Sequence, residues 1–236
     1  MTGARSALLQ DSHLMAPFLC LSAYGLTQKG FSFIMDKSFM QAMEHRRTYY
    51  HIGDECSVEQ GQIIDMLDRV LLAVPSAFNG QSTRLVLLMG SHHQMLWEIV
   101  KHTLSEIVPE EAMVRTREKI DKSFLAGCGT ILFFEDRAVV ERQKRENPKY
   151  AESFEMYSAQ TSAMHQFAIW TLLEDMGFGA SLQHYNPLID SRVAEQWNLN
   201  TEWRLMAQMP FGTPLSSPPE KEQLLPLHKR RLVFTN

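Results

Sequence analysis

Residues 61–90 contain a helical pattern, a polar loop and an apolar strand in direct succession, and this order restricts the chain to folds that combine helices with a sheet. In GQIIDMLDRVLLAV (residues 61–74) the apolar side chains recur at helical spacing along one face. Pro75 and Gly80 interrupt the helix, and TRLVLLMG (residues 83–90) is typical of a buried strand. The loop between them, PSAFNGQS (residues 75–82), is too polar for a core, which favours a ligand lying on it.

The remaining patterns extend this alternation of helices and strands. We expect helices over residues 37–47, 93–108, 154–176 and 191–199, a polar helical segment up to Phe124, and strands over 129–136, 180–189 and 202–212. The charged stretch 137–153 is expected to form an exposed helix–loop excursion. No internal repeat and no domain-splitting linker is apparent, so one α+β domain is predicted over residues 35–236.

The predicted helix 154–176 is apolar on more than one side, notably in FAIWTLLEDM. A helix that is hydrophobic all round must be buried all round. A single domain of this size offers few such places. We therefore expect this helix at a subunit interface.

Composition excludes several classes of protein. The 236 residues carry a formal charge of −4, which gives no reason to expect nucleic acid as a partner, and no apolar run is long enough for a membrane span. Three widely spaced cysteines, Cys20, Cys56 and Cys128, fit neither a zinc site nor a disulfide framework. A reducing cytoplasm is the expected compartment.

Residues 1–34 allow two interpretations. LMAPFLCLSAYGL (residues 14–26) has the apolar character of a signal-peptide core, but Asp11 precedes it, Arg5 is the one basic residue before it, and no clear cleavage site follows. We favour the other interpretation, in which residues 1–34 are a poorly structured leader and the folded domain begins at Met35.

Three polar groups are candidate binding sites. Arg46, Arg47 and Thr48 combine two cations and a hydroxyl, which suits a phosphate, although cations are also favourable at a helix C-terminus. The loop side chains suit a planar ligand with donors and acceptors, or a plain helix cap; they are Ser76, Asn79, Gln81 and Ser82. His184 would be a general acid, a stacking ring or a structural histidine.

Other chemistries lack their motifs. The chain has no G-x-S-x-G, no H-E-x-x-H and no phosphate-cradling G-x-x-x-x-G-K-[ST]. His92 and His93 are adjacent and point apart on a helix, so no metal site is expected. A nicotinamide would have to bind without the Rossmann G-x-G-x-x-G.

Four motifs in order, RRTYY, PSAFNGQSTRLVLL, AGCGTILFFED and GFGASLQHYNP, resemble the FMN-dependent nitroreductase family, in the branch named after the fatty acid repression mutant proteins. The resemblance spans residues 37–234. It implies a three-layer α/β/α sandwich with a mostly antiparallel central sheet. It also implies an intertwined homodimer that holds FMN at the subunit interface.

The resemblance also assigns roles to individual residues. It implies that Arg46, Arg47 and Thr48 bind the phosphate and ribityl chain, and that Asn79 and Gln81 address the isoalloxazine ring, with Ser82 beside them. The segment Leu182, Gln183 and His184 matches the strand that runs beside the N5 edge of the ring.

Two positions depart from the family pattern. Tyr50 stands where many members have a lysine or arginine. The C-terminal K-x-R pair is reduced to Lys221, since Gln223 takes the second place, and Arg230 or Arg231 is the expected substitute. All four of Tyr50, Lys221, Arg230 and Arg231 are candidate cofactor-binding residues.

The chemistry implied by the resemblance is carried by the flavin. NADH or NADPH would reduce FMN, and a small aromatic acceptor such as a nitroaromatic or a quinone would then be reduced in a ping-pong scheme. The branch also implies a link to lipid or oxidative stress. The alternative is a flavin-binding regulatory protein with little turnover, in which residues 137–153 form a lid over the flavin.

Overall fold

A computed structural model describes residues 37–218 and 220–236. The predicted leader, residues 1–34, lies outside the described residues. The helices are α1 (Phe39–His45), α2 (Gln60–Ala73), α3 (Gly90–Ser105), α4 (Glu110–Ile120), α5 (Arg137–Glu146), α6 (Phe154–Asp175) and α7 (Asp190–Gln196). The strands are β1 (Ile52–Gly53), β2 (Thr83–Met89), β3 (Gly129–Asp136), β4 (Gly179–Ala180) and β5 (Trp203–Pro214). The described chain also has three short 3₁₀ helices, η1 (Ala77–Asn79), η3 (Pro148–Ser153) and η4 (Leu227–Lys229), and η2 (Asp121–Leu125) is one turn of π-helix.

The strands form one sheet in the order β1-β5-β3-β2, and β4 also pairs with β5. Every strand pair is antiparallel. β3 is buried along its whole length because β2 and β5 flank it, in a register that sets Leu132 opposite Val86 and Gln208. The mostly antiparallel sheet expected from the sequence is confirmed.

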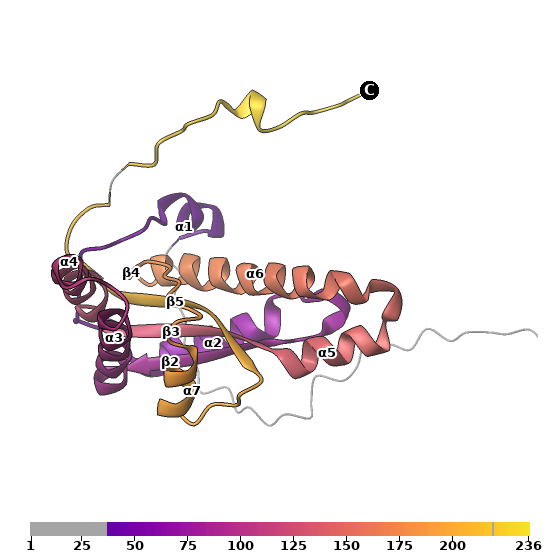
Figure 1. The fold of residues 1–236 in the computed structure, drawn as a ribbon. Coiled ribbons are helices and arrows are strands. Elements are labelled where there is room, and N and C mark those ends of the chain that lie inside the picture. The colour runs from indigo at the N-terminus through magenta and orange to yellow at the C-terminus, as the bar shows by residue number, and fades with distance from the viewer. Residues whose placement is uncertain (1–36, 219) are drawn as a thin grey trace, which may run out of the picture. The chain divides into compact units, whose positions relative to one another are not determined.

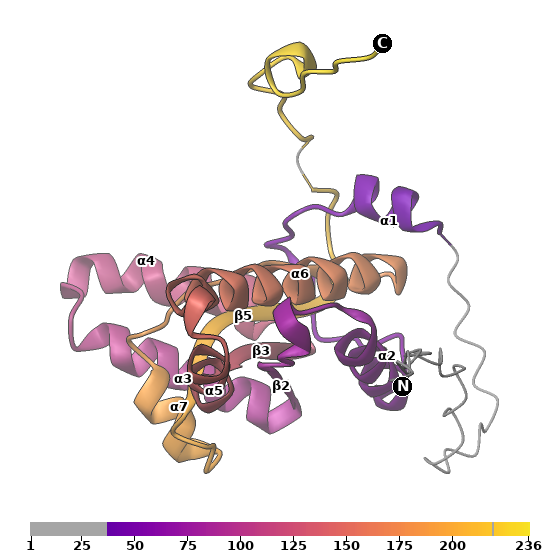
Figure 2. The ribbon, with the colours of Figure 1, turned by 90° about the vertical axis from the view of Figure 1, so that its right-hand side faces the viewer.

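Helices cover both faces of this sheet (Figures 1 and 2). α6 runs along one face beside α2, and α3 and α7 lie on the other, with α4 packed on α3. α1 lies against α6 on the side away from the sheet. The architecture is therefore the three-layer α/β/α sandwich.

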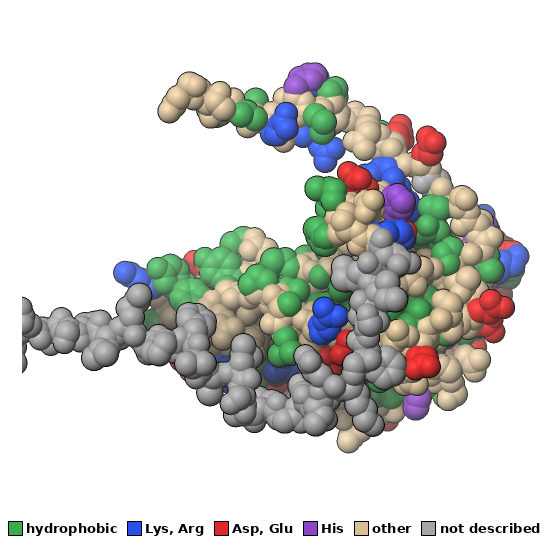
Figure 3. All heavy atoms as spheres, turned by 180° about the vertical axis from the view of Figure 1, so that it is seen from behind, with side chains coloured by type: hydrophobic (Ala, Val, Ile, Leu, Met, Phe, Trp, Pro, Cys, Tyr) green, Lys and Arg blue, Asp and Glu red, His purple; other side chains and the backbone are tan. Residues whose placement is uncertain are grey.

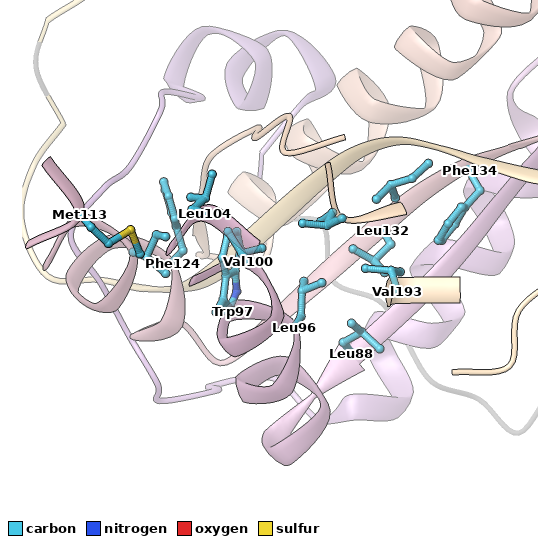
Figure 4. Packing of buried hydrophobic residues seen from close by; sticks show 13 residues of the cluster. Leu88, Leu96, Trp97, Val100, Leu104, Met113, Phe124, Leu132, Phe134 and Val193 are labelled. Carbon is cyan, nitrogen blue, oxygen red and sulfur yellow. The ribbon is translucent and has the colours of Figure 1, made fainter. Parts of the chain in front are cut away.

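The alternation of side chains along β3 divides the core between the two faces. Leu132 and Phe134 pack with Trp97 and Val100 of α3 in one cluster of buried apolar side chains, drawn in Figure 4. Trp97 lies 4.9 Å from Phe124 between ring centroids, which connects η2 to the same cluster. This core fixes α3, η2 and the sheet relative to one another.

The strand predicted over residues 180–189 is wrong beyond its first residue. β4 ends at Ala180, and further on a single backbone bridge joins Gln183 to Gln208. The reason lies in β5, where Pro210 accepts a hydrogen bond from the Ser181 amide but has no N–H to return. The ladder is interrupted there.

Two expectations about exposure are also corrected. The 137–153 segment is not an exposed excursion, because Val139, Val140 and Gln143 of α5 are buried. The bounds expected for α6 are confirmed to within one residue, but the helix is not buried all round within one chain. Met156 and Met164 are 54% and 42% exposed. Along the part of the chain that the structure describes, no helix is both long and apolar enough to cross a bilayer.

The α3 core gives a direct test of this packing. Val100 has no exposed surface, whereas Val114 on α4 is 58% exposed. We expect Val100→Ala to lower the free energy of unfolding by about 2–3 kcal/mol, since it removes buried apolar surface and leaves a cavity. Val114→Ala is the matched control and should change it by less than about 0.5 kcal/mol. Equal effects in urea denaturation would contradict the assigned core.

Candidate functional site

The segment that follows α1 lies beside β4. A capping box of Ser38 and Gln41 starts α1, and the helix ends at His45, after which Arg46, with a ψ of 126°, turns the chain out of the helix. Thr48 then forms a parallel bridge with Ala180, and the Tyr49 amide donates to the Ala180 carbonyl at 3.0 Å. The backbone of β4 thus holds the Arg46–Tyr50 segment in an extended form.

Arg46 is the most unusual side chain of this segment. Its guanidinium carbon lies 4.3 Å from the centre of the Trp170 ring, and its Nε is buried with no hydrogen-bond partner among the described residues. Burial lowers the pKa of Arg46, the neighbouring Arg47 lowers it further, and Glu174 opposes both. A buried donor without an acceptor costs free energy. An anion bound here would remove that cost.

Arg47 differs from Arg46 in its contacts. Its Nη1 donates to the backbone carbonyls of Glu44 at 2.5 Å and of Arg46 at 2.8 Å. These bonds hold Arg47 against the end of α1, and its charge remains next to that of Arg46. Arg46 and Arg47 are thus adjacent cations, the charge of Arg47 acts on Arg46, and Thr48 follows them in the chain. That this group binds a phosphate stays a prediction.

The chain after β4 presents free backbone amides. The amides of Ser181, Gln183 and Tyr185 all donate toward β5, to Pro210, Gln208 and the Gln208 side chain respectively. Because successive amides of an extended chain point to opposite sides, those of Leu182 and His184 point away from β5. Neither has an acceptor among the described residues. Two donors are thereby left on the side where Thr48 pairs with Ala180.

The loop 75–82 has a strained backbone. Phe78, Asn79 and Gln81 have φ values of 52°, 51° and 53°, in the left-handed region that residues other than glycine rarely adopt. Each such residue costs on the order of 1 kcal/mol, and conformations of this kind cluster at functional sites. The loop conformation therefore supports a binding role over a simple helix cap.

Local hydrogen bonds hold this strained loop. The Gln81 amide donates to the Ser76 hydroxyl at 3.0 Å, and the Gln81 side chain donates to Asn79 Oδ1 at 3.0 Å. From α5, Gln143 Nε2 donates to the Ala77 carbonyl at 3.0 Å. A side chain at Gly80 would meet the Gln143 amide, so glycine allows α5 to approach. The exposed amides of Asn79 and Gln81 are fixed in place by these contacts.

Ser82 is separated from its neighbours in the loop. It is buried, and its hydroxyl pairs with that of Ser158 on α6 at 3.2 Å. Ser158 also donates to the buried carboxylate of Glu135. Ser82 therefore lies inside the chain, where it joins the loop to α6, whereas Asn79 and Gln81 face outward.

The two candidate regions lie at opposite ends of α6. Phe78 packs on Phe154 with ring centroids 5.3 Å apart, whereas Arg46 lies on Trp170. These two positions on α6 are 16 residues apart. At 1.5 Å per residue this is about 24 Å along the helix. One chain does not bring the loop and the Arg46 segment together.

The other candidate residues are all exposed. Lys221, Arg230 and Arg231 are exposed in the segment beyond β5. Tyr50 is 47% exposed, and Lys119 Nζ lies 5.9 Å from its ring centroid. A lysine from α4 thus stands close to the position where Tyr50 replaces a basic residue.

Two residues of these regions were missed by sequence reasoning. Trp170 lies within the apolar pattern of α6, which gives no sign that its ring supports an arginine. Gln143 lies in a charged stretch that predicts an exposed helix, although it is buried and bonded to the loop. Gln143 was not predicted because the sequence does not show that one face of α5 is buried.

The sequence profile of the nitroreductase family matches residues 43–213, a range that includes α2 to α7, the Arg46 segment and the polar loop. The chain belongs to the nitroreductase family. Nitroreductase FRM2 of Saccharomyces cerevisiae is 32% identical over 188 residues, which cover 78% of this chain and 92% of FRM2. The predicted relationship to the fatty acid repression mutant branch is confirmed.

Solved nitroreductases share the fold. Lactococcus lactis CinD in complex with nicotinic acid has a TM-score of 0.76 at 39% identity, and its complex with 4-nitrophenol has 0.74 at 37%. Both comparisons cover 84% of this chain and 100% of CinD. A structure from Desulfovibrio desulfuricans, a nitroreductase-like protein in complex with FMN, has a TM-score of 0.61 at 15% identity. That comparison covers 84% of this chain and 98% of the Desulfovibrio chain. That last comparison supports the fold alone.

The bond from α5 to the loop can be tested by one substitution. Gln143→Leu keeps the approximate size of the side chain but leaves the Ala77 carbonyl without its donor. We expect it to lower the free energy of unfolding by about 1–2 kcal/mol and to speed hydrogen exchange at residues 77–82. Gln94→Leu, on an exposed position of α3, is the control and should change neither. Unchanged exchange in the Gln143 variant would show that α5 does not hold the loop.

Proposed function

We propose that this nitroreductase-family protein is an FMN-dependent NAD(P)H oxidoreductase that reduces nitroaromatic or quinone-like acceptors at a site between two copies of the chain. The proposal is carried by two sets of free donors: the partly buried Arg46 guanidinium, which is unpaired among the described residues, and the amides of Leu182 and His184. Membership of the nitroreductase family, and a structure of this fold in complex with FMN, make FMN the preferred ligand.

The chemistry of the donors fits FMN. Arg46, Arg47 and Thr48 offer charge-assisted and hydroxyl hydrogen bonds to phosphate oxygens. The amides of Leu182 and His184 offer neutral donors to the flavin ring. Gln183 lies between them in the chain and is hydrogen-bonded through its backbone to Gln208 of β5. We further propose that Tyr50, Lys221, Arg230 and Arg231 contribute to the phosphate site once a second copy is present.

Two copies are needed to complete the proposed site. Asn79 and Gln81 lie at the other end of α6 from Arg46, so they reach the same flavin if α6 of one chain packs antiparallel to α6 of its partner. Figure 3 shows hydrophobic side chains gathered over α6 and beside α1. They include Phe39, Met164 and Phe167, which are 57%, 42% and 39% exposed. Apolar surface of this kind marks an interaction site.

The protein's own role in the proposed reaction is to bind, orient and enclose. Bound FMN would supply hydride transfer from NADH or NADPH and the return of electrons to an acceptor in a ping-pong scheme. In this proposal the amides of Leu182 and His184 would donate to the ring and favour negative charge on its reduced form. CinD was solved with 4-nitrophenol and with nicotinic acid, which supports small aromatic acceptors for this chain as well.

The alternative role, a regulatory flavoprotein with a lid, receives less support. The charged segment 137–153 is tied to the body by Arg137 and Lys144, which pair with Glu155 at 2.6 Å and 2.5 Å. Gln143 is also bonded to the loop. These contacts favour a segment 137–153 that is fixed beside the proposed site over one that opens and closes as a lid. We propose a reducing cytoplasm as its compartment, since the chain has three cysteines, widely spaced in the sequence.

The proposal is tested by the spectrum of the purified protein and by one arginine variant. We expect a yellow protein that releases FMN in acid, is bleached by NADH or NADPH, and is reoxidised by a nitroaromatic. Arg46→Ala removes charge-assisted bonds to the phosphate and should weaken FMN binding by about 10- to 100-fold.

The matched control is Arg115→Ala, because Arg115 is an exposed arginine on α4. It should leave FMN affinity unchanged. A colourless protein that takes up no added FMN would overturn the proposed function, and equal affinities of the two variants would remove Arg46 from the phosphate site.

A further inference from the structure

Trp170 contacts the Arg46 guanidinium and belongs to none of the predicted binding motifs. Its ring centre lies 4.3 Å from the guanidinium carbon, well inside the range of a cation–π contact. The indole Nε1 is buried and, like the Nε of Arg46, has no hydrogen-bond partner among the described residues. The ring face is therefore the principal contact that Trp170 makes with Arg46.

The nearest carboxylate does not pair with Arg46. Glu174 lies one helical turn beyond Trp170 on α6, and its charge acts on Arg46. Its Oε1, however, lies 3.5 Å from Lys37 Nζ, which also donates to the Glu174 carbonyl at 3.0 Å. Glu174 forms no ion pair with Arg46 within 4.0 Å, the usual limit of a salt bridge. The guanidinium is thus held by an aromatic face and keeps its hydrogen-bond donors for a ligand.

This arrangement suits a site that must keep its arginine in place without neutralising it. A carboxylate partner would compete with an incoming phosphate for the same donors, whereas an aromatic face uses none of them. Arg47 stands next in the chain, and its charge repels that of Arg46. Without the Trp170 face, the Arg46 side chain would be free to turn away from Arg47 toward solvent.

We propose that Trp170 is a positioning residue, whose ring face orients Arg46 toward the terminal phosphate of the flavin nucleotide and so makes the site select FMN over riboflavin, which has no phosphate. The inference rests on the proposed function. Trp170 acts through Arg46, so its effect is confined to the phosphate-bearing ligand. A residue that merely supported the fold would affect both flavins alike.

The test measures the affinities of the full-length apoprotein for FMN and for riboflavin by quenching of flavin fluorescence. We expect Trp170→Leu to weaken FMN binding about five- to tenfold, as loss of a partly buried cation–π contact predicts, and to leave riboflavin binding unchanged. Trp170→Phe keeps an aromatic face and should restore most of the FMN affinity. In an Arg46→Ala background, Trp170→Leu should have no further effect.

Trp197→Leu is the matched control. It makes the same change at a tryptophan that follows α7, on the other face of the sheet, where its ring lies 6.5 Å from that of His92. We expect both flavin affinities to be unchanged. Thermal unfolding of each variant checks that it is folded. If Trp170→Leu does not fold, the test rests on Trp170→Phe, which should bind FMN nearly as well as the original chain does.

Three results would overturn the inference. They are an unchanged FMN affinity in Trp170→Leu, an equal loss for FMN and riboflavin, and a further loss when Trp170→Leu is added to Arg46→Ala. If the original chain bound riboflavin and FMN equally, the phosphate site itself would be wrong. If it bound neither, the proposed function would fail before Trp170 came into question.

Discussion

The packing of α6 along one face of the sheet determines where the polar loop and the Arg46 side chain lie. At one end of the helix, Phe154 and Ser158 hold the strained loop, and at the other end Trp170 holds Arg46. Because the helix is a rigid rod between them, neither group can move toward the other without unpacking the sheet. The separation of about 24 Å is thus built into the fold.

That separation explains why the apolar surface of α6 matters for function. Within one chain, the helix leaves methionine and phenylalanine side chains exposed, and each half of the proposed site is open. A second copy packed antiparallel along α6 would cover the apolar surface and join the halves in the same step. Under this arrangement the oligomer and the cofactor site are one structural feature, and a flavin bound between the chains would add to the stability of the dimer.

Much of the fold was predictable because its signals are local. The bounds of β3 are those expected from GTILFFED, and α6 is correct to within one residue. The errors arose where a distant residue decided the outcome. Pro210 on β5 interrupts the strand expected after Ala180, and no pattern within residues 180–189 indicates this. The many charged residues of α5 predicted an exposed segment, although Val139, Val140 and Gln143 are buried.

The sequence supplies the residue types of the candidate site but not their arrangement. It predicts a ligand on PSAFNGQS, and the positive φ angles of Phe78, Asn79 and Gln81 add a physical reason that composition does not contain. The burial of Ser82 and the stacking of Trp170 depend on which face of α6 meets each segment. Helical periodicity does not settle this, since α6 is apolar on more than one side.

The central claim, a flavin site shared between two chains, is tested most directly by subunit complementation. Chains carrying Arg46→Ala and Asn79→Ala are co-expressed with different tags, and the heterodimer is isolated. A shared site predicts that one of the two sites regains both residues and binds FMN, about one flavin per two chains. The reciprocal heterodimer, a doubly substituted chain with an unaltered one, should then bind FMN weakly at both sites. If instead the reciprocal heterodimer retains one tight site and the mixed one has none, each site lies within a single chain and the account is wrong.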